Sequence, residues 1–313
     1  MNIRLGERDL EIFKCMARLR MLTMNQMAVL FYEGHPLPGL ELKKANGALR
    51  VRVSRLIKGD FVRSAPLSFA RAAFVKGYFL GPNGIAVLKD LREYEDYRKP
   101  RWMERKHTMC DQRQSLLRAA SGMVDAGHMC LLHGPHHVIV NNFLTNLLML
   151  SRCREGFEVL DWLGDRDATF RFTLKGERFT YDPDLYVKVT SECERGERTI
   201  FLEVDRDTTT IPVLRRKIYR AHQYYLSREY KELTGSGLFP RLCFLVPDRK
   251  RAGTLTGAIM KVLGDYNIPT FPCWISTFDE MGVFSIDQGR VTDVQLVKPW
   301  VSERGRLVPS PLV

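Results

Sequence analysis

Acidic side chains follow two apolar segments in the second half of the chain. Asp182-Pro183-Asp184 lies in a segment with strand-like alternation, and Glu203 and Asp205 close the apolar run Thr199–Val204. A carboxylate at the end of a buried strand is costly unless it is paired or bound to a metal. If the two strands are neighbours, Asp184, Glu203 and Asp205 converge on one cation, and oxygen ligands suit Mg²⁺ or Mn²⁺. Such a cation activates water and holds a phosphate during phosphodiester cleavage.

Lys217 lies in the helix that the sequence predicts over Ile211–Tyr230, where its ammonium could reach a scissile phosphate as a point charge. Each residue also has a simpler interpretation. Asp184 could start a turn, Glu203 and Asp205 could pair with nearby arginines in a buried ion network, and Lys217 could be solvated. The occurrence of all four in order favours the catalytic interpretation.

Three further side chains are accessory candidates for this chemistry. His136 is either a general base or a helix cap, and Asp165 is a further metal ligand or a surface acid. Tyr224 follows Lys217 by seven residues on the same helix face, and it is either a nucleophile that forms a covalent 5′-phosphate link or a core residue. The spacing favours the core for Tyr224. The sequence has no GxxxxGK[ST] loop, which excludes a P-loop ATPase.

The elements that must position these residues alternate between helix and strand. Apolar periodicity predicts strands over 157–163, 168–174, 179–189, 199–204, 242–246 and 270–275, and helices over 135–151, 211–230 and 252–263. The runs over 199–204 and 242–246 are nearly continuous, which is typical of strands buried on both faces. This order predicts a mixed sheet flanked by helices.

The first 92 residues have a different pattern. Helices are predicted over 7–20, 24–32 and 43–58, with Thr23 and Gln26 as a capping box at the second, and a β-hairpin follows over 61–80. Three helices and a hairpin are the pattern of a winged helix-turn-helix, whose third helix enters the DNA major groove. The cations expected to contact duplex DNA lie on the third helix and the hairpin: Arg50, Arg52, Arg55, Lys58, Arg63 and Lys76.

Charge supports a polyanionic partner for that region. The 313 residues contain 48 Lys and Arg against 36 Asp and Glu, and the first 89 carry 15 against 6, whereas the other 224 carry 33 against 30. A concentrated basic region is typical of nucleic-acid binding. Scattered cysteines, a charged N-terminus and the lack of a long apolar run predict a cytoplasmic protein without a membrane span. We expect a DNA-binding domain over 1–92, a charged linker over 93–114 and a second domain over 115–313.

The second domain resembles the PD-(D/E)XK nuclease superfamily. The similarity rests on Pro183-Asp184, the apolar strand that ends in Glu203-Val204-Asp205, and the helix that follows. The lysine that the signature places two residues after Glu203 is Asp205 here. Some branches of the superfamily carry the lysine on the following helix, and Lys217 is in that place.

The whole arrangement is similar to the replication-relaxation proteins, which are related to MobC-type plasmid relaxases. The similar stretches span about residues 7–275 and include Arg8-Asp9, Leu22-Thr23 with Gln26, His136-His137 with Asn141-Asn142, Trp162–Asp165, Pro183-Asp184, Glu203–Arg206 and Lys217-Ile218 with Tyr224.

This resemblance implies a winged helix joined to a restriction-endonuclease-like domain. It implies a metal-dependent DNA endonuclease or nickase of a plasmid or integrative element, which acts in replication or transfer. The alternative is a catalytically inactive DNA-binding regulator or mobilisation accessory protein on the same scaffold. The implied partners are duplex DNA, such as a plasmid origin, and a second copy of the chain or a relaxosome-like assembly.

Overall fold

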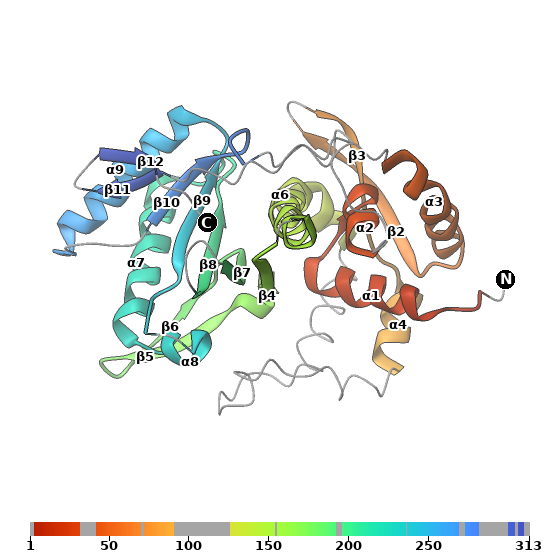
Figure 1. Cartoon of the computed structure of the whole chain (residues 1–313), viewed down its shortest axis with the longest axis horizontal. Helices are drawn as coiled ribbons and strands as arrows, with labels where there is room; N and C mark the ends of the chain where they lie inside the picture. The colour runs from red at the N-terminus through yellow and green to blue at the C-terminus, as the bar shows by residue number, and fades with distance from the viewer. Residues whose placement is uncertain are drawn as a thin grey trace. The chain divides into compact units, whose positions relative to one another are not determined.

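The computed structural model describes residues 3–31, 42–69, 72–90, 126–153, 155–191, 196–235, 237–268, 273–281, 300–303 and 306–309 (Figure 1). The chain forms two units, and among the described elements the boundary falls after Cys153. Unit 1 contains the elements before that point and unit 2 those after it. Within the described ranges no helix is both long and apolar enough to cross a bilayer.

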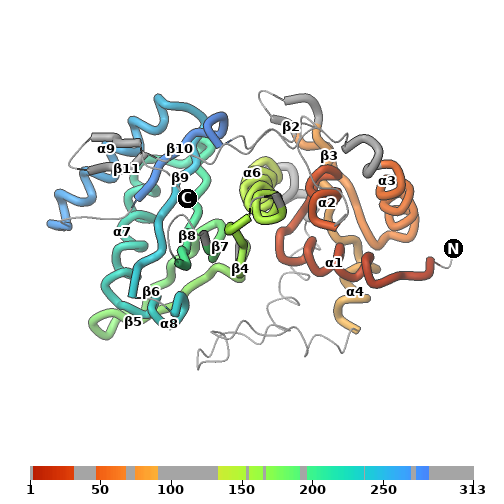
Figure 2. The backbone as a smooth tube through the Cα atoms, viewed as in Figure 1, coloured from red at the N-terminus to blue at the C-terminus, as the bar shows by residue number. Residues whose placement is uncertain are grey.

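Unit 1 begins with three helices and a small antiparallel sheet. Helices α1 (Glu7–Leu19), α2 (Met24–Phe31) and α3 (Leu42–Lys58) precede strands β2 (Val62–Phe69) and β3 (Ala72–Leu80), and α4 (Pro82–Asp90) follows them. The short strand β1 (Leu22–Thr23) pairs with β3, so the sheet order is β1-β3-β2. The backbone trace in Figure 2 shows α1 and α2 close together beside this sheet. The predicted order of helices and hairpin in this half is therefore confirmed.

Helix α2 starts at the predicted capping box. The Thr23 backbone N–H donates to Gln26 Oε1 at 2.7 Å, and the Gln26 N–H donates to Thr23 Oγ1 at 3.2 Å. Two N–H groups that the first turn leaves without helical partners are thus satisfied. Both residues are buried, and the Gln26 side chain still has donors to offer to a neighbouring helix.

Helix α6 (Ala126–Cys153) packs in unit 1, which differs from the expected domain boundary at residue 115. Asn141 Nδ2 donates to Met21 O at 2.6 Å, and Gln26 Nε2 donates to Asn142 Oδ1 at 2.7 Å. A Cβ on Gly134 would lie 2.5 Å from a methyl of Leu67 in β2, so a larger residue would require the buried Leu67 side chain to move. The physical reason for the difference is this buried polar seam. The predicted linker over 93–114 lies outside the described residues.

Unit 2 is built on a mixed seven-stranded sheet in the order β12-β11-β10-β9-β8-β7-β4. Strands β8, β9 and β10 run parallel to one another, and every other neighbouring pair is antiparallel. The predicted mixture of helices and mixed sheet is confirmed. The strands are β4 (Phe157–Gly164), β7 (Leu185–Ser191), β8 (Gly196–Val204), β9 (Arg241–Val246), β10 (Cys273–Thr277), β11 (Trp300–Glu303) and β12 (Arg306–Pro309).

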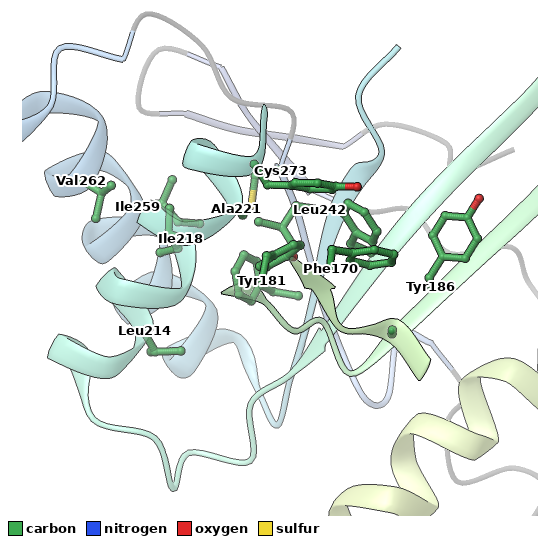
Figure 3. Packing of buried hydrophobic residues seen from close by; sticks show 14 of the residues in the cluster. Phe170, Tyr181, Tyr186, Leu214, Ile218, Ala221, Leu242, Ile259, Val262 and Cys273 are labelled. Carbon is green, nitrogen blue, oxygen red and sulfur yellow. The ribbon is translucent and has the colours of Figure 1, made fainter. Parts of the chain in front are cut away.

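Two helices cover one face of this sheet. Helices α7 (Ile211–Ser227) and α9 (Arg249–Asp265) connect the parallel strands and lie side by side in Figure 1. Ile218 of α7 and Ile259 and Val262 of α9 belong to one buried apolar cluster (Figure 3). This packing fixes α7 against the ends of the central strands. The short helices of the unit are η2 (Asp165–Ala168) and α8 (Tyr230–Thr234).

A separate hairpin packs on the inner side of α7. Strands β5 (Phe170–Leu174) and β6 (Glu177–Tyr181) pair only with each other, and Phe170 stacks on Tyr224 of α7 with ring centroids 5.5 Å apart. The strand predicted over 179–189 is therefore interrupted at Asp182–Asp184, and its two halves join different sheets. Proline at 183 explains the break, because it cannot donate to a strand ladder.

Candidate functional site

Two hydrogen bonds fix Asp184 beside Glu203. The Asp184 N–H donates to Leu202 O at 2.9 Å, and Asp184 Oδ2 accepts from the Val204 N–H at 2.7 Å. Leu202 and Val204 flank Glu203 at the end of β8, so Asp184 lies against the same strand end. Glu203 is 2% exposed, and Asp184 is half-buried. The break between β6 and β7 thus places one carboxylate next to another.

Lys217 of α7 joins the two carboxylates. Its Nζ lies 2.5 Å from Glu203 Oε2 and 3.9 Å from Asp184 Oδ1. Because both oxygens lie near the same Nζ, the separation between Glu203 Oε2 and Asp184 Oδ1 cannot exceed the sum of these two distances. The structure thus brings Asp184, Glu203 and Lys217 together, and the roles expected of them stay predictions. The Lys217 side chain is 36% exposed, that of Asp184 15% and that of Glu203 only 3%.

The electrostatics of the cluster keep Lys217 charged. Burial by itself lowers the pKa of the Lys217 ammonium, but the charges of Glu203 and Asp184 outweigh burial and leave the pKa above its ordinary value.

Tyr181, which the sequence analysis did not single out, lies close to the same carboxylates. Burial, with Glu203 and Asp184 nearby, raises the pKa of the Tyr181 phenol well above its usual range. The only sequence signal for Tyr181 is its position three residues before Asp184.

Asp205 is paired with a different cation. Its Oδ2 accepts from Arg251 Nε of α9 at 2.7 Å, and its Oδ1 accepts from the Asp207 N–H at 3.0 Å. Arg251 also pairs with Asp207 at 2.9 Å and donates to Thr209 O. This geometry matches the ion-pair alternative for Asp205, with Arg251 as the partner, and its role as a metal ligand stays a prediction. Strand β8 ends at Val204, so alternation along the strand no longer directs Asp205 toward Glu203.

Two carboxylates at one point fit a magnesium-type ion. In the described part of the chain, no group of three His, Cys, Asp or Glu side chains is placed to hold a metal. Mg²⁺, however, keeps several waters and is usually bound by one or two carboxylates together with substrate phosphates. Asp184 and Glu203 match that donor set, because both carboxylates are held by the protein and both lie close to the Lys217 ammonium.

The accessory candidates lie in three different elements. Tyr224 is 3% exposed among aromatic rings, and burial raises its pKa, so it is a core residue, as its spacing favoured. His136 lies half-buried on α6 in unit 1, edge-on to the ring of His137. Asp165 begins η2 directly after β4, and its side chain lies outside what the structure describes.

The cations predicted to bind DNA divide into an exposed group and Arg52, which is paired with Asp9. Arg50, Arg55 and Lys58 are exposed on α3, and Lys76 is exposed on β3. Arg63 of β2 is also exposed, although its guanidinium pairs with Asp60 at 2.8 Å. These side chains remain accessible to a ligand.

Arg52 is different from its neighbours on α3. Its guanidinium forms a two-pronged pair with Asp9 of α1, with Nε 2.8 Å from Oδ1 and Nη2 on Oδ2, and it also donates to Arg4 O. Asp9 is 4% exposed and accepts from the Gly6 N–H at 2.7 Å, which caps α1. The hydrogen bond to Asp9 raises the pKa of Arg52. Arg52 therefore ties α3 to α1, and its contact with DNA stays a prediction.

Comparisons with known proteins identify a family but no individual relative. Searches of curated proteins and of solved structures found no match to the chain. A family model of replication-relaxation proteins matches residues 13–242, which span both units and well over half of the chain. With this match and the order of elements described above, the protein belongs to the replication-relaxation family.

Proposed function

We propose that the protein is a metal-dependent DNA endonuclease that nicks duplex DNA in plasmid replication or transfer. One observation carries the proposal: Asp184, Glu203 and Lys217 come from three separate segments and converge at one point. Membership of the replication-relaxation family supports the biological setting. The set Asp, Glu and Lys is that of PD-(D/E)XK nucleases, with the lysine supplied by α7 instead of β8.

Each residue has a distinct task in this proposal. Asp184 and Glu203 would hold Mg²⁺ or Mn²⁺, which supplies Lewis-acid activation of water and of the phosphate when it is bound. The Val204 N–H holds Asp184 Oδ2 and leaves Oδ1 on the side of Lys217. Lys217 carries a positive charge beside both carboxylates, where it would stabilise negative charge that develops on a phosphate.

Unit 1 supplies duplex recognition. Its helices and its β1-β3-β2 sheet form a winged helix-turn-helix, with α3 as the helix that enters the major groove and the β2–β3 hairpin as the wing. Arg50, Arg55 and Lys58 contact phosphates from α3. Arg63 and Lys76 add contacts from the hairpin. A single site in each chain cuts one strand, and cleavage of both strands requires a symmetric dimer.

A second function has one specific observation in its favour. The Lys217 ammonium contacts Glu203 Oε2 directly, and Asp205 stands where the nuclease signature has lysine. An ion pair of this kind neutralises a carboxylate that a metal would otherwise bind. On this alternative the protein is a non-cutting DNA-binding regulator or mobilisation accessory factor on a nuclease-like scaffold.

The deciding experiment is nicking of a supercoiled plasmid that carries the element's own origin, with Mg²⁺ or Mn²⁺. We expect the full-length protein to produce open circles, and we expect Asp184→Asn, Glu203→Gln and Lys217→Met to lose this activity. Lys261→Met removes an exposed lysine from α9 and serves as the matched control, with activity unchanged. Supercoiled plasmid that stays intact with the wild-type protein and either metal, while DNA binding persists, favours the regulator.

A further inference from the structure

Helix α7 carries an unusual concentration of positive charge beside the candidate active site. Arg215, Arg216, Lys217 and Arg220 lie within six residues, and the helix contains no acidic residue. Lys217 is paired with Glu203 and Asp184. Among the described residues, Arg216 and Arg220 form no ion pair with a carboxylate, and Arg216 is exposed. These two arginines therefore have charge to offer to a ligand.

The β5–β6 hairpin continues this positive surface. Arg220 donates to Thr180 O of β6 at 3.3 Å, and Thr180 is the strand partner of Arg171 in β5. Phe170 and Phe172 pack inward against Tyr224, so alternation turns Arg171 outward. Arg171 and Arg178 are both exposed. The positively charged side chains thus extend from Lys217, through Arg220 about one helical turn away, onto the outer face of the β5–β6 hairpin.

The charge of this region stands out from the rest of the second half. Residues 170–181 and 211–227 together carry seven Lys and Arg and one acid, Glu177. Residues 90–313 as a whole carry 33 basic and 30 acidic residues, so this half is nearly neutral on average. Solubility alone does not require positive charges to be concentrated beside one site. A phosphodiester backbone is the ligand that matches it in charge and in extended shape.

We propose that the outer face of the β5–β6 hairpin, with the Arg216 and Arg220 edge of α7, binds the sugar-phosphate backbone of DNA beside Lys217. This surface is a second DNA contact, separate from α3 and contained within unit 2. The inference rests on the proposed function for the identity of its ligand. It goes further by assigning residues that hold the strand next to the cluster of Asp184, Glu203 and Lys217.

The test is the salt dependence of DNA binding by the full-length protein without divalent metal. A fluorescent duplex is titrated with wild type, with Arg171→Ala/Arg178→Ala, and with Lys250→Ala/Lys261→Ala, which removes two exposed charges from α9. The slope of log K against log salt is negative, and we expect the hairpin variant to reduce its magnitude by about two, because each lost phosphate contact reduces it by about 0.9. We expect the α9 control to keep the wild-type slope.

A conservative variant separates charge from packing. Arg171→Lys/Arg178→Lys keeps both charges, and we expect it to restore most of the slope. An unchanged slope in the alanine variant, with an unchanged Tm, overturns the proposal.

Plasmid nicking tests the proposed nuclease activity separately from the salt dependence of DNA binding. If the wild-type protein leaves supercoiled plasmid intact while the hairpin variant reduces the magnitude of the salt slope, the nuclease proposal fails and the hairpin surface stands. If the wild type nicks plasmid and the slope is the same for all variants, the nuclease stands and the hairpin surface fails. The two proposals are thus decided independently.

Discussion

The Lys217 ammonium of α7 lies 2.5 Å from Glu203 Oε2 at the end of β8, although the two residues are 14 positions apart in the chain. The loop between β8 and α7 brings them together, and Arg251 holds that loop through Asp205, Asp207 and Thr209. The lysine therefore approaches the carboxylates from the helix side. Asp205, at the position where the nuclease signature has lysine, instead anchors the loop through its bond to Arg251.

This ion pair predicts a loss of stability at alkaline pH. The pKa of Lys217 is raised in the folded protein, so its stabilising effect is complete below the unfolded-state pKa of about 10.4 and is lost as pH rises toward the folded value. We expect Lys217→Met to be less stable than wild type at pH 7 and to lack this part of the alkaline decline. Urea unfolding from pH 7 to 11 measures both effects. Lys261→Met is the control, and curves for wild type and Lys217→Met that run parallel over this range contradict the prediction.

The two acidic residues at the end of β8 are predicted to differ in metal binding. We expect Glu203→Gln and Asp184→Asn to weaken Mn²⁺ binding by roughly tenfold or more, because each removes a ligand. We expect Asp205→Asn to keep most of the affinity while lowering stability, because its carboxylate is bonded to Arg251. Isothermal titration calorimetry with Mn²⁺ checks this. Loss of binding in Asp205→Asn with binding retained in Asp184→Asn would return Asp205 to the ligand set.

Neighbouring arginines of α3 are predicted to have opposite phenotypes. Arg52→Ala should destabilise the protein by about 1–3 kcal/mol, because Asp9 is left buried without its charged partner. Lysine at 52 should recover little of this, because it lacks the planar fork. Arg55→Ala should leave Tm unchanged and weaken duplex binding. Thermal unfolding and a binding titration on the same samples decide the matter, and the reverse assignment of the two phenotypes refutes it.

The polar seam between α2 and α6 is predicted to stabilise unit 1. Gln26→Ala removes the cap on the Thr23 N–H and the bond to Asn142, for an expected loss of about 1–3 kcal/mol. A double-mutant cycle with Asn142→Ala should show coupling, because the two amides bond directly at 2.7 Å. Urea unfolding measures the cycle. Strictly additive losses would show that the two side chains act separately.

Local patterns in the sequence were sufficient for much of the fold and for part of the candidate site. The capping box of Thr23 and Gln26 located α2, and apolar runs located β8 and β9, because these signals depend on residues a few positions apart. The acids after two apolar segments predicted that Asp184 and Glu203 would meet. The resemblance placed the lysine on the following helix, and the packing of α7 brings the Lys217 ammonium to Glu203.

What the tertiary structure alone decided is the pairing of side chains over long separations. Asp9 meets Arg52 across 43 residues, Asp205 meets Arg251 across 46, and Gln26 meets Asn142 across 116. Each pair contains a residue that looks functional or merely solvated in the sequence, because its partner lies on another element. Which elements pack together depends on the burial of whole faces, so the roles of Arg52 and Asp205, and the place of α6 in unit 1, could be known only once the chain had folded.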